Sequence, residues 1–404
     1  MALKVKVIGI GAAGNKAAAQ LIKNKVLERS QVILLNSTDR DIPAEYRTDL
    51  FIKFGDTGGC GKIRSLAKNL MLEALQSGTI PIDQFIDGDE KFFVIVTSTE
   101  GGTGSGASPV LGEYLQSITT NESNPNGVPV HMIAFTGFED DVRGLKNTVD
   151  WFNELNENFI VQAISNKKCL QYCDGNRRKA EEYANQIFAD RVSILTGMHI
   201  NPSDSNVDNM DLFRLNSTPG YMTVEKIMLQ KIRDQEQFNS SVAEALDRSV
   251  SLETEPSVKR LGVIIDASAR IQAVIDESYK VIKKVYGEFP YDIFRHKQES
   301  GNEDSVSIIV SGMKMPIDEI TAVCNKFKKA MEYTDSGKDA FFGKTGAMNT
   351  NIGNIDTAGF SGSSVGKNKE QMTLNKNAFF AKYGNVKKQT IKMTNNSGMA
   401  KDEL

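Results

Sequence analysis

The strongest constraint on the fold is a regular alternation, in the first half of the chain, of apolar β-type runs with helix-length amphipathic segments. The five runs are KVKVIGI (4–10), QVILLN (31–36), KFFVIVTS (91–98), VPVHMIAFT (128–136) and FIVQAIS (159–165). Nearly continuous apolar strands separated by helix-length segments are typical of a parallel sheet whose two faces are both covered by helices. The sequence therefore predicts a doubly wound, mostly parallel α/β sheet.

The second half of the chain has a different organisation. A long helical pattern at 177–197 ends the alternating region and predicts a central helix. The patterns beyond it predict a smaller α/β domain. They are helical around 222–250, 269–286 and 316–333, and β-type at 260–268 and 304–315.

A change of composition marks the end of the chain. From residue 340 onward, 27 of 65 residues are Gly, Asn, Ser or Thr, and the net charge is +5 in a chain whose total charge is −3. Such a segment is typical of a flexible tail. We therefore expect four parts: 1–176 as a nucleotide-binding domain, 177–203 as the central helix, 204–335 as a smaller C-terminal domain, and 336–404 as a flexible basic tail.

Composition and charge indicate which partners, metal sites and cellular location to expect. A net charge of −3 gives no overall attraction to nucleic acid or to an anionic membrane. Four scattered cysteines and three histidines predict neither a disulfide framework nor a zinc site. We expect a cytoplasmic protein, because the start has no signal-peptide pattern and no run reaches membrane-spanning length. The final Lys401-Asp402-Glu403-Leu404 is then interpreted as a coincidental retention signal.

Glycine-rich loops follow two of the predicted strands. Gly9-Ile10-Gly11-Ala12-Ala13-Gly14 comes after the first run and opens a helix, whose N-terminal N–H groups can hold a phosphate. Together with Asp39, this loop alone is equally typical of a dinucleotide-binding dehydrogenase. The third run leads into Gly101-Gly102-Thr103-Gly104-Ser105-Gly106, and GDTGGCGK (55–62) offers another loop. A dehydrogenase needs one such loop, so several glycine-rich loops indicate a bound triphosphate. None of these loops has the spacing of a P-loop.

With these loops in view, the sequence resembles the tubulin/FtsZ superfamily of polymerising GTPases. TSTEGGTGSGAS (97–108) matches its signature loop, GGGTGSG or GGGTGTG, except that Glu100 replaces the first glycine. The resemblance covers roughly residues 4–335. It implies the family's fold, GTP or GDP as the bound nucleotide together with Mg²⁺, and assembly of the chain with itself into head-to-tail filaments.

The resemblance also implies which residues contact the nucleotide. Gly9, Gly11, Gly14 and Asn15 resemble the first nucleotide loop, and Asn36, Thr38 and Asp39 resemble the loop that faces phosphate and magnesium. Thr57, Gly58 and Gly59 resemble the γ-phosphate sensor, and Gly101, Gly102, Thr103, Gly104, Ser105 and Gly106 would hold the diphosphate.

Sugar and base contacts follow from the same resemblance. Glu139 and Arg143 in TGFEDDVR resemble the ribose loop, with Asp140 in place of a glycine, and Asn166 and Asn185 resemble the two guanine-reading residues. The family has a base-stacking aromatic four residues before the second reader, where this chain has Glu181. Tyr183 is the nearest substitute.

A pair of acids follows the predicted central helix. Asn206-Val207-Asp208-Asn209-Met210-Asp211 matches the family's NxDxxD catalytic loop. Asp208 and Asp211 can project from one face of a helix start, as two carboxylates handling one water require, although acids there are also common helix caps. The resemblance implies that Asn206, Asp208 and Asp211 act on the nucleotide of the neighbouring subunit, so that hydrolysis requires assembly.

The tail suggests a branch of the family. It contains a near repeat, AFFGK (340–344) and AFFAK (378–382), and NSTPG (216–220) lies shortly after the acid pair. These features resemble the TubZ branch, which segregates plasmid or phage DNA through a DNA-bound adaptor that grasps the tail. We expect residues 340–404 to bind such an adaptor, without direct sequence-specific contact to nucleic acid and without a membrane.

Other functions stay open from the sequence alone. An FtsZ-like filament for cell division or phage positioning would share every nucleotide motif. A non-hydrolysing scaffold of the same fold would explain Glu100. A nicotinamide-dependent enzyme would explain the first glycine loop, but neither the second loop nor the acid pair.

Overall fold

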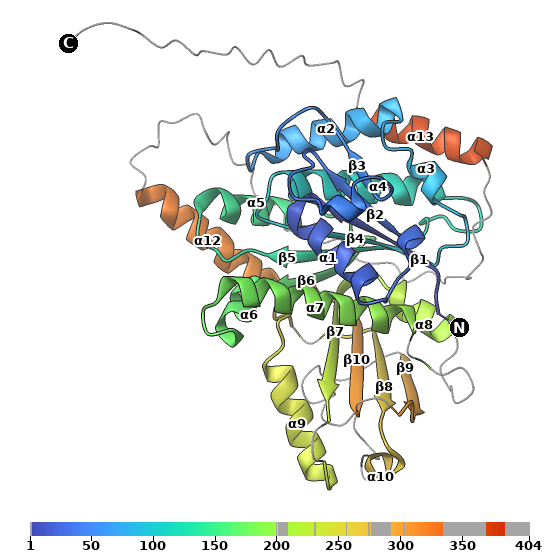
Figure 1. Ribbon diagram of the computed structural model, residues 1–404, viewed down its shortest axis with the longest axis vertical. Helices are drawn as coiled ribbons and strands as arrows, with labels where there is room; N and C mark the ends of the chain where they lie inside the picture. Colours follow the sequence, from blue (N-terminus) through green and yellow to red (C-terminus); the bar gives the residue numbers. More distant parts are fainter. Residues whose placement is uncertain are drawn as a thin grey trace, which may run out of the picture.

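The computed structural model describes residues 2–198, 200, 209–229, 232–255, 257–273, 275, 292–301, 304–333 and 369–383. Its strands form one sheet in the order β3-β2-β1-β4-β5-β6-β7-β10-β8-β9 (Figure 1). In chain order they are β1 (Val5–Ile10), β2 (Val32–Asn36), β3 (Phe51–Lys53), β4 (Phe92–Ser98), β5 (Val130–Thr136), β6 (Ile160–Ser165), β7 (Gly220–Met228), β8 (Arg260–Asp266), β9 (Asp292–Gln298) and β10 (Ser305–Met313).

Helices connect these strands and cover the sheet. In chain order they are α1 (Gly11–Lys23), α2 (Arg64–Ser77), α3 (Ile82–Phe85), α4 (Thr103–Thr119), α5 (Val142–Asn153), α6 (Asn166–Tyr172), α7 (Arg177–Thr196), α8 (Asn209–Asn216), α9 (Gln235–Asp247), α10 (Ala269–Gln272), α12 (Ile317–Tyr333) and α13 (Lys369–Tyr383). Two short 3₁₀ turns are Arg29–Gln31 and Ala44–Tyr46. No helix of the described residues is both long and apolar enough to cross a membrane.

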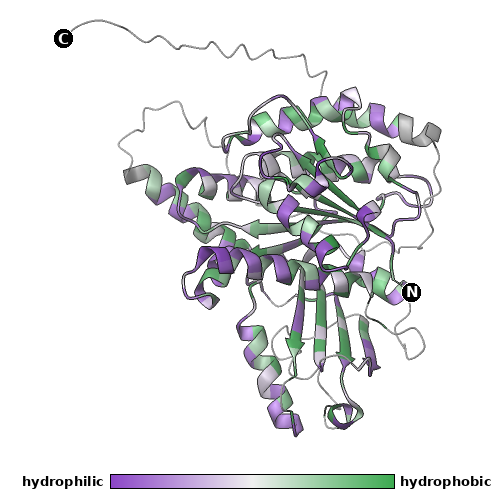
Figure 2. Cartoon of the chain, in the orientation of Figure 1, coloured by the Kyte–Doolittle hydropathy of each residue, from purple (hydrophilic) through white to green (hydrophobic). Residues whose placement is uncertain are grey.

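The five apolar runs form strands, as the sequence predicts. β1 pairs in parallel with β2 and with β4, so that Ile8 lies opposite Ile33 on one side and Ile95 on the other. Every residue of β1 is buried, because helices lie on both faces of this part of the sheet. Figure 2 shows the hydrophobic character of the strands, in contrast to the mixed character of the helices around them.

The sheet continues into the second half of the chain. β7 pairs in parallel with β6, with Gly220 opposite Ile160, and β10 lies antiparallel between β7 and β8. The prediction of helix around 222–250 is therefore wrong for β7, and the helix there begins only with α9. VEKIM, with its charged residues, has a helix-like pattern. Its backbone nevertheless completes the hydrogen-bonded ladder between β6 and β10, because tertiary pairing outweighs local propensity.

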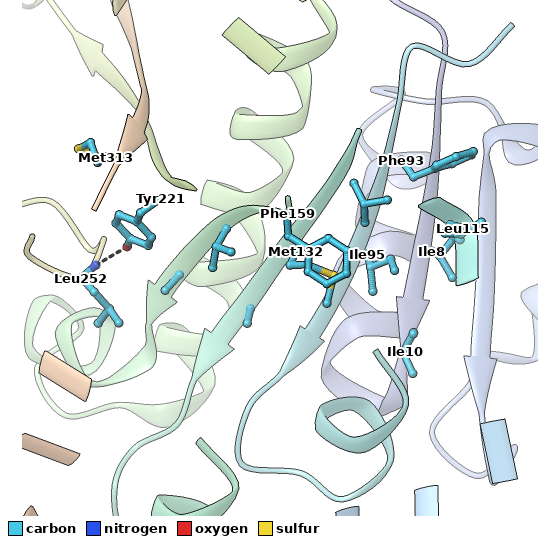
Figure 3. Close-up of a cluster of buried hydrophobic side chains, with 14 of the residues drawn as sticks. Ile8, Ile10, Phe93, Ile95, Leu115, Met132, Phe159, Tyr221, Leu252 and Met313 are labelled. Carbon is cyan, nitrogen blue, oxygen red and sulfur yellow. Dashed lines mark hydrogen bonds between the residues drawn. The ribbon is translucent and has the colours of Figure 1, made fainter. Parts of the chain in front are cut away.

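The two faces of the sheet carry different helices. α1 and α7 pack on one face, where Ala17, Leu21 and Phe188 join a cluster with the β-strand residues Val7 and Val94. α2, α4 and α5 pack on the other face. Figure 3 shows this second cluster, which runs from the β1 residues Ile8 and Ile10 to Tyr221 of β7. There the hydroxyl oxygen of Tyr221 accepts a hydrogen bond of 3.0 Å from the backbone N–H of Leu252, which ties β7 to the segment after α9.

The structure corrects one expectation about the tail. The composition predicts a flexible tail over residues 336–404, but residues 369–383 form helix α13, which packs against α4. Phe379 of this helix is buried in the same cluster as the α2 and α4 side chains. The physical reason is aromatic burial, which a count of Gly, Asn, Ser and Thr does not register. The repeat at 340–344 and the predicted helix from 276 onward lie outside the described residues.

Candidate functional site

The glycine loops meet at one edge of the sheet, because the carboxyl ends of parallel strands share an edge. Gly11, at the end of β1, has a φ of +76°, and a Cβ placed there would lie 3.1 Å from the backbone nitrogen of Gly104. The hydroxyl groups of Ser37 after β2 and Thr103 after β4 are 3.0 Å apart. The structure therefore brings together the loops that follow β1, β2 and β4, as the sequence predicts.

Some of the predicted nucleotide glycines are required by packing. A Cβ on Gly14 would lie 2.1 Å from the carbonyl oxygen of Val96, so α1 can approach β4 only with a glycine there. Likewise, a Cβ on Gly106 would lie 2.3 Å from the carbonyl oxygen of Arg64, at the contact between α4 and α2. Gly9, Gly102 and Gly104 are similarly crowded.

Other glycines of the set face open space. Gly58, Gly59 and Gly101 would present a Cβ to no atom within 4 Å. Because Gly59 has a φ of +123°, a side chain there would be strained as well. A loop backbone without neighbouring atoms is accessible to a phosphate group, and Gly101 also directly precedes the N-terminus of α4. Gly58, Gly59 and Gly101 are thus the glycines whose accessibility suits nucleotide contact.

Three polar side chains of the predicted site have unsatisfied buried atoms. They are Oδ1 of Asn15, Nδ2 of Asn36 and Oγ1 of Thr57, and none of them has a hydrogen-bond partner in the described structure. Buried polar atoms are normally paired, so these three suit a polar ligand. Asn15 is only 1% exposed, and its Nδ2 donates to the carbonyl of Leu35, which fixes α1 on β2. Asp39 is exposed beside this edge.

Two residues that sequence analysis missed support the loops. The buried guanidinium of Arg64 donates to the carbonyl of Ser105 at 3.0 Å and pairs with Glu154 at 3.1 Å. Burial lowers the pKa of Arg64, although the negative charge of Glu154 opposes this effect. Nδ2 of Asn147 donates to the carbonyls of Glu100 and Lys62, at 3.0 and 3.1 Å. No local pattern identifies these residues, since their partners are distant in the sequence.

Glu100, the departure from the family's signature, turns away from the glycine loop. Its carboxylate accepts a 3.0 Å hydrogen bond from the backbone N–H of Glu139. It lies so close to Gly137 that a Cβ on that glycine would be 1.5–2.0 Å from carboxyl atoms. Burial raises the pKa of Glu100, with a further contribution from nearby Asp141 and Asp140. The replacement therefore fills space beside the predicted ribose loop, and the phosphate loop stays open.

The predicted ribose loop is held by charges from other elements. Glu139, at a φ of +61°, places its carboxylate 3.3 Å from Lys167 of α6 and pairs also with Lys326 of α12. Asp140 pairs with Arg177 at the start of α7. A cavity of about 220 Å³ adjoins this loop, and its lining includes Glu100, Glu139, Lys167, Glu319, Ile320 and Val323. Arg143, in the first turn of α5, is half-buried.

The predicted base-reading residues are only partly brought together. Asn166 begins α6 directly after β6, and Asn185 lies on α7, which packs against α6. Tyr183 is two positions from Asn185 and so points about 200° around the helix. It is 42% exposed and lines a different cavity of about 650 Å³, between α7, β7 and α9. The structure therefore does not place Tyr183 for stacking beside Asn185.

The acid pair is described only in part. Asn206 and Asp208 lie outside the described residues, whereas Asp211 lies in the first turn of α8, 3.8 Å from Arg214. α8 adjoins the end of α7, because Asn216 donates to the carbonyl of Leu195.

α8 is also fixed to the amino end of the parallel strands. His131, near the start of β5, bonds through Nε2 to the Asn216 carbonyl at 2.9 Å. The 20 residues of α7 span about 30 Å and separate α8 from α6 (Figure 1). Asp211 is thus at the edge of the sheet opposite to the glycine loops of its own chain.

Comparison with known sequences gives several matches. Residues 4–174 match the family described as Tubulin/FtsZ family, GTPase domain. The cell division protein FtsZ of Mycoplasmopsis pulmonis is 26% identical over 215 residues, covering 52% of this chain and 51% of that protein. FtsZ 1 of Archaeoglobus fulgidus is 24% identical over 326 residues, covering 77% and 83%. The chain thus matches about half the length of the first relative and most of the second.

Solved structures share the fold. TubZ of Clostridium botulinum phage c-st, in a form without its C-terminal tail, superposes with a TM-score of 0.64 at 15% identity, covering 82% of this chain and 98% of that one. A GTPγS-form protofilament of TubZ from Bacillus thuringiensis serovar israelensis gives 0.64 at 18%, covering 82% and 93%. A GTPγS-bound protofilament of CetZ2 from Haloferax volcanii gives 0.65 at 16%, covering 81% and 100%. Residues 4–174 therefore match the GTPase domain of the tubulin/FtsZ family, and the chain shares the fold of the TubZ and CetZ structures.

Proposed function

We propose that the chain binds GTP at the glycine-loop edge and hydrolyses it only between subunits of a head-to-tail filament. The observation that carries this proposal is the position of Asp211, which lies beyond α7 at the opposite edge of the sheet. An acid about 30 Å away cannot act on the nucleotide of its own subunit. When subunits stack in one direction, the α8 edge of one faces the glycine-loop edge of the next.

The proposal gives the described residues distinct roles. Gly58, Gly59 and Gly101 offer open backbone to the phosphates, and Thr57 offers a buried hydroxyl without a partner. Asn36 and Asp39 belong to the loop proposed to face Mg²⁺, which would screen the phosphate charge when bound. Asn166 and Asn185 would read the guanine edge. Glu139 and Arg143 would flank the ribose, although the carboxylate of Glu139 is already paired with two lysines.

Within the family, we propose that the filament segregates plasmid or phage DNA in a prokaryotic cytosol. The basic, aromatic tail over 340–404 supports this role, since it suits capture by a DNA-bound adaptor. A net +5 spread over 65 residues is too dilute for tight binding to DNA at physiological salt. An FtsZ-like filament in cell division or phage positioning is the second candidate, favoured by the FtsZ relatives.

Assembly-dependent hydrolysis is tested by the dependence of GTP turnover on protein concentration. Because a complete site needs two subunits, phosphate release per subunit should rise steeply above a critical concentration, together with light scattering. A specific activity that stays constant from dilute monomer upward would contradict hydrolysis across the interface. Calorimetry with GTP, ATP and NAD checks the nucleotide independently, and binding of NAD in preference to GTP would contradict the proposed site.

A further inference from the structure

Helix α13 lies on the outer side of α4, in the part of the molecule that also carries α2 (Figure 1). The ring of Phe379 packs edge-on against Tyr114 of α4, with ring centroids 5.2 Å apart. Phe380 is 6.0 Å from the same tyrosine, and Tyr383 is 5.0 Å from Phe379. Only 5% of the Phe379 surface is exposed, so this contact buries the aromatic anchor of the tail.

Polar contacts surround the aromatic cluster. The carboxylate of Glu113 on α4 accepts hydrogen bonds from Nζ of Lys382 at 2.8 Å and from the hydroxyl of Tyr383 at 2.6 Å. Asn375 donates to the carbonyl of Thr120 at 2.8 Å, just beyond the last turn of α4. On the α4 side, the carboxylate of Glu113 and the backbone carbonyl of Thr120 accept these hydrogen bonds. On α13, Lys382, Tyr383 and Asn375 donate them, so the α4 face suits an aromatic, basic helix.

The docked residues belong to the repeat that suggests partner binding. Phe379, Phe380 and Lys382 are the aromatic and cationic members of AFFAK at 378–382. In the described structure they contact α4 of their own chain. A partner that binds these side chains therefore competes with α4 for the same atoms.

We propose that the face of α4 around Glu113 and Tyr114 is a docking site for an aromatic, basic helix, and that residues 369–383 of the same chain occupy it. An outside protein binds this half of the tail only after displacing α13 from α4. The docking itself is independent of the proposed function. Only the identity of the competitor, a tail-binding adaptor, rests on it.

The contact has the features of a reversible one. Of the α13 side chains from 374 to 383, only Phe379 is fully buried, whereas Leu374 is 63% exposed. Segments with few buried contacts open at much lower free energy than the core of a domain. The 35 residues between α12 and α13 keep the released helix tethered, and a tether of that kind gives an effective concentration on the order of 1 mM. The tethered helix therefore rebinds readily, yet a tight partner can displace it.

Hydrogen exchange on the full chain, diluted and without nucleotide, tests the docking. Amides of residues 374–383 should be protected in the wild type. Phe379→Ala should increase their exchange by about tenfold or more, because it removes the buried anchor. Leu374→Ala is the matched control on the same helix and should change exchange by less than about threefold, since its side chain faces solvent. Equal exchange in the wild type and in Phe379→Ala would overturn the proposal.

A labelled peptide of residues 369–383 provides a second measurement. It should bind full-length Phe379→Ala, whose site is vacated, at least about tenfold more tightly than wild type, whose tethered helix competes. Glu113→Gln in that background should weaken peptide binding. Equal affinity for the two chains would contradict occupation by α13. Protection that grows with protein concentration would show docking on a second copy and also overturn the proposal. None of these results depends on GTP hydrolysis or on an adaptor, so the proposed function can fail separately.

Discussion

Asp211 lies in the first turn of α8 with its side chain one quarter exposed, so two roles are open to it. It can stabilise the helix start together with Arg214, or it can handle the water that attacks the neighbour's nucleotide. We expect Asp211→Ala to leave GTP binding by the isolated subunit unchanged and to lower hydrolysis by about 100-fold or more, which should leave filaments static. Calorimetry and phosphate release measure the two effects.

Arg214→Ala is the matched control for that substitution. It removes the ion pair, whose two groups are 3.8 Å apart, but keeps the carboxylate. GTP turnover should therefore stay close to the wild-type value. Equal losses in Asp211→Ala and Arg214→Ala would show that the pair only stabilises α8.

His131 is the residue that should make stability depend on pH. It is fully buried in β5, and burial lowers its pKa from 6.5 to about 4. The unfolded chain therefore binds a proton that the native state excludes, so stability falls as pH falls from 6.5 towards 4. This residue alone should reduce the free energy of unfolding by about 2 kcal/mol between pH 7 and pH 5.

Urea unfolding at the two pH values, for the wild type and for His131→Gln, isolates this contribution. Carboxylates titrate in both chains, so only the difference between the two pH dependences reports on the histidine. The variant should lose about 2 kcal/mol less than the wild type on acidification. Parallel pH dependences would contradict a buried, neutral His131.

At the scale of single residues, the sequence predicts the positions of the site better than the directions of its side chains. The glycine loops are local patterns, and the structure places them together. The orientation of Glu100 depends on Gly137 and Gly144, which lie some forty residues away and leave room for its carboxylate. Tyr183 is close to Asn185 in sequence, but helical geometry directs its side chain to another cavity.

At the scale of elements, two kinds of glycine can be separated experimentally. Gly14 allows α1 to pack on β4, and a methyl group there would meet the Val96 carbonyl at 2.1 Å. Gly14→Ala should therefore reduce the free energy of unfolding by about 3 kcal/mol or abolish soluble expression. Gly101 faces open space, so Gly101→Ala should change stability by less than about 0.5 kcal/mol.

Nucleotide affinity distinguishes the two variants further. The methyl group of Gly101→Ala points into the space proposed for phosphate and should weaken GTP binding at least tenfold, although the fold is intact. Urea unfolding and calorimetry measure the two properties. If Gly101→Ala binds GTP like the wild type, the loop does not approach the nucleotide. If Gly14→Ala is as stable as the wild type, the contact between α1 and β4 is more adaptable than the structure indicates.

Elements were predictable where their pattern was local and their environment uniform. The five parallel strands are buried on both faces, so their sequences are mostly apolar and easily recognised. β7 has charged residues at Glu225 and Lys226, and its strand conformation comes from pairing with β6 and β10. α13 was hidden in a low-complexity composition, and its position is fixed by contacts with α4 that no local pattern encodes.

At the scale of the whole molecule, the chain has two edges with proposed functions and an additional surface. The glycine loops and α8 lie at opposite edges of one sheet, which suits assembly in a single direction. The α4 face covered by α13 belongs to the layer of helices over one side of the sheet. We therefore expect the proposed tail docking and the proposed filament growth to use different parts of the subunit.

Deletion of residues 340–404 tests this separation. The truncated chain should polymerise and hydrolyse GTP at rates within about twofold of the wild type, because neither proposed edge is touched. It should lose recruitment of a centromere-bound adaptor, whose ligand is the tail. Sedimentation and phosphate release measure the first property, and pull-down of the adaptor with its DNA measures the second.

Each outcome of the deletion has a distinct meaning. Because removal of α13 uncovers Tyr114 on α4, lower solubility is expected and must be separated from loss of assembly. Full-length Phe379→Ala, which keeps the basic tail, is the control for that effect. Failure of the soluble truncated chain to polymerise would place the tail in the filament contact. If the truncated chain still segregates DNA, the adaptor proposal is contradicted. Neither result bears on the docking of α13 on α4.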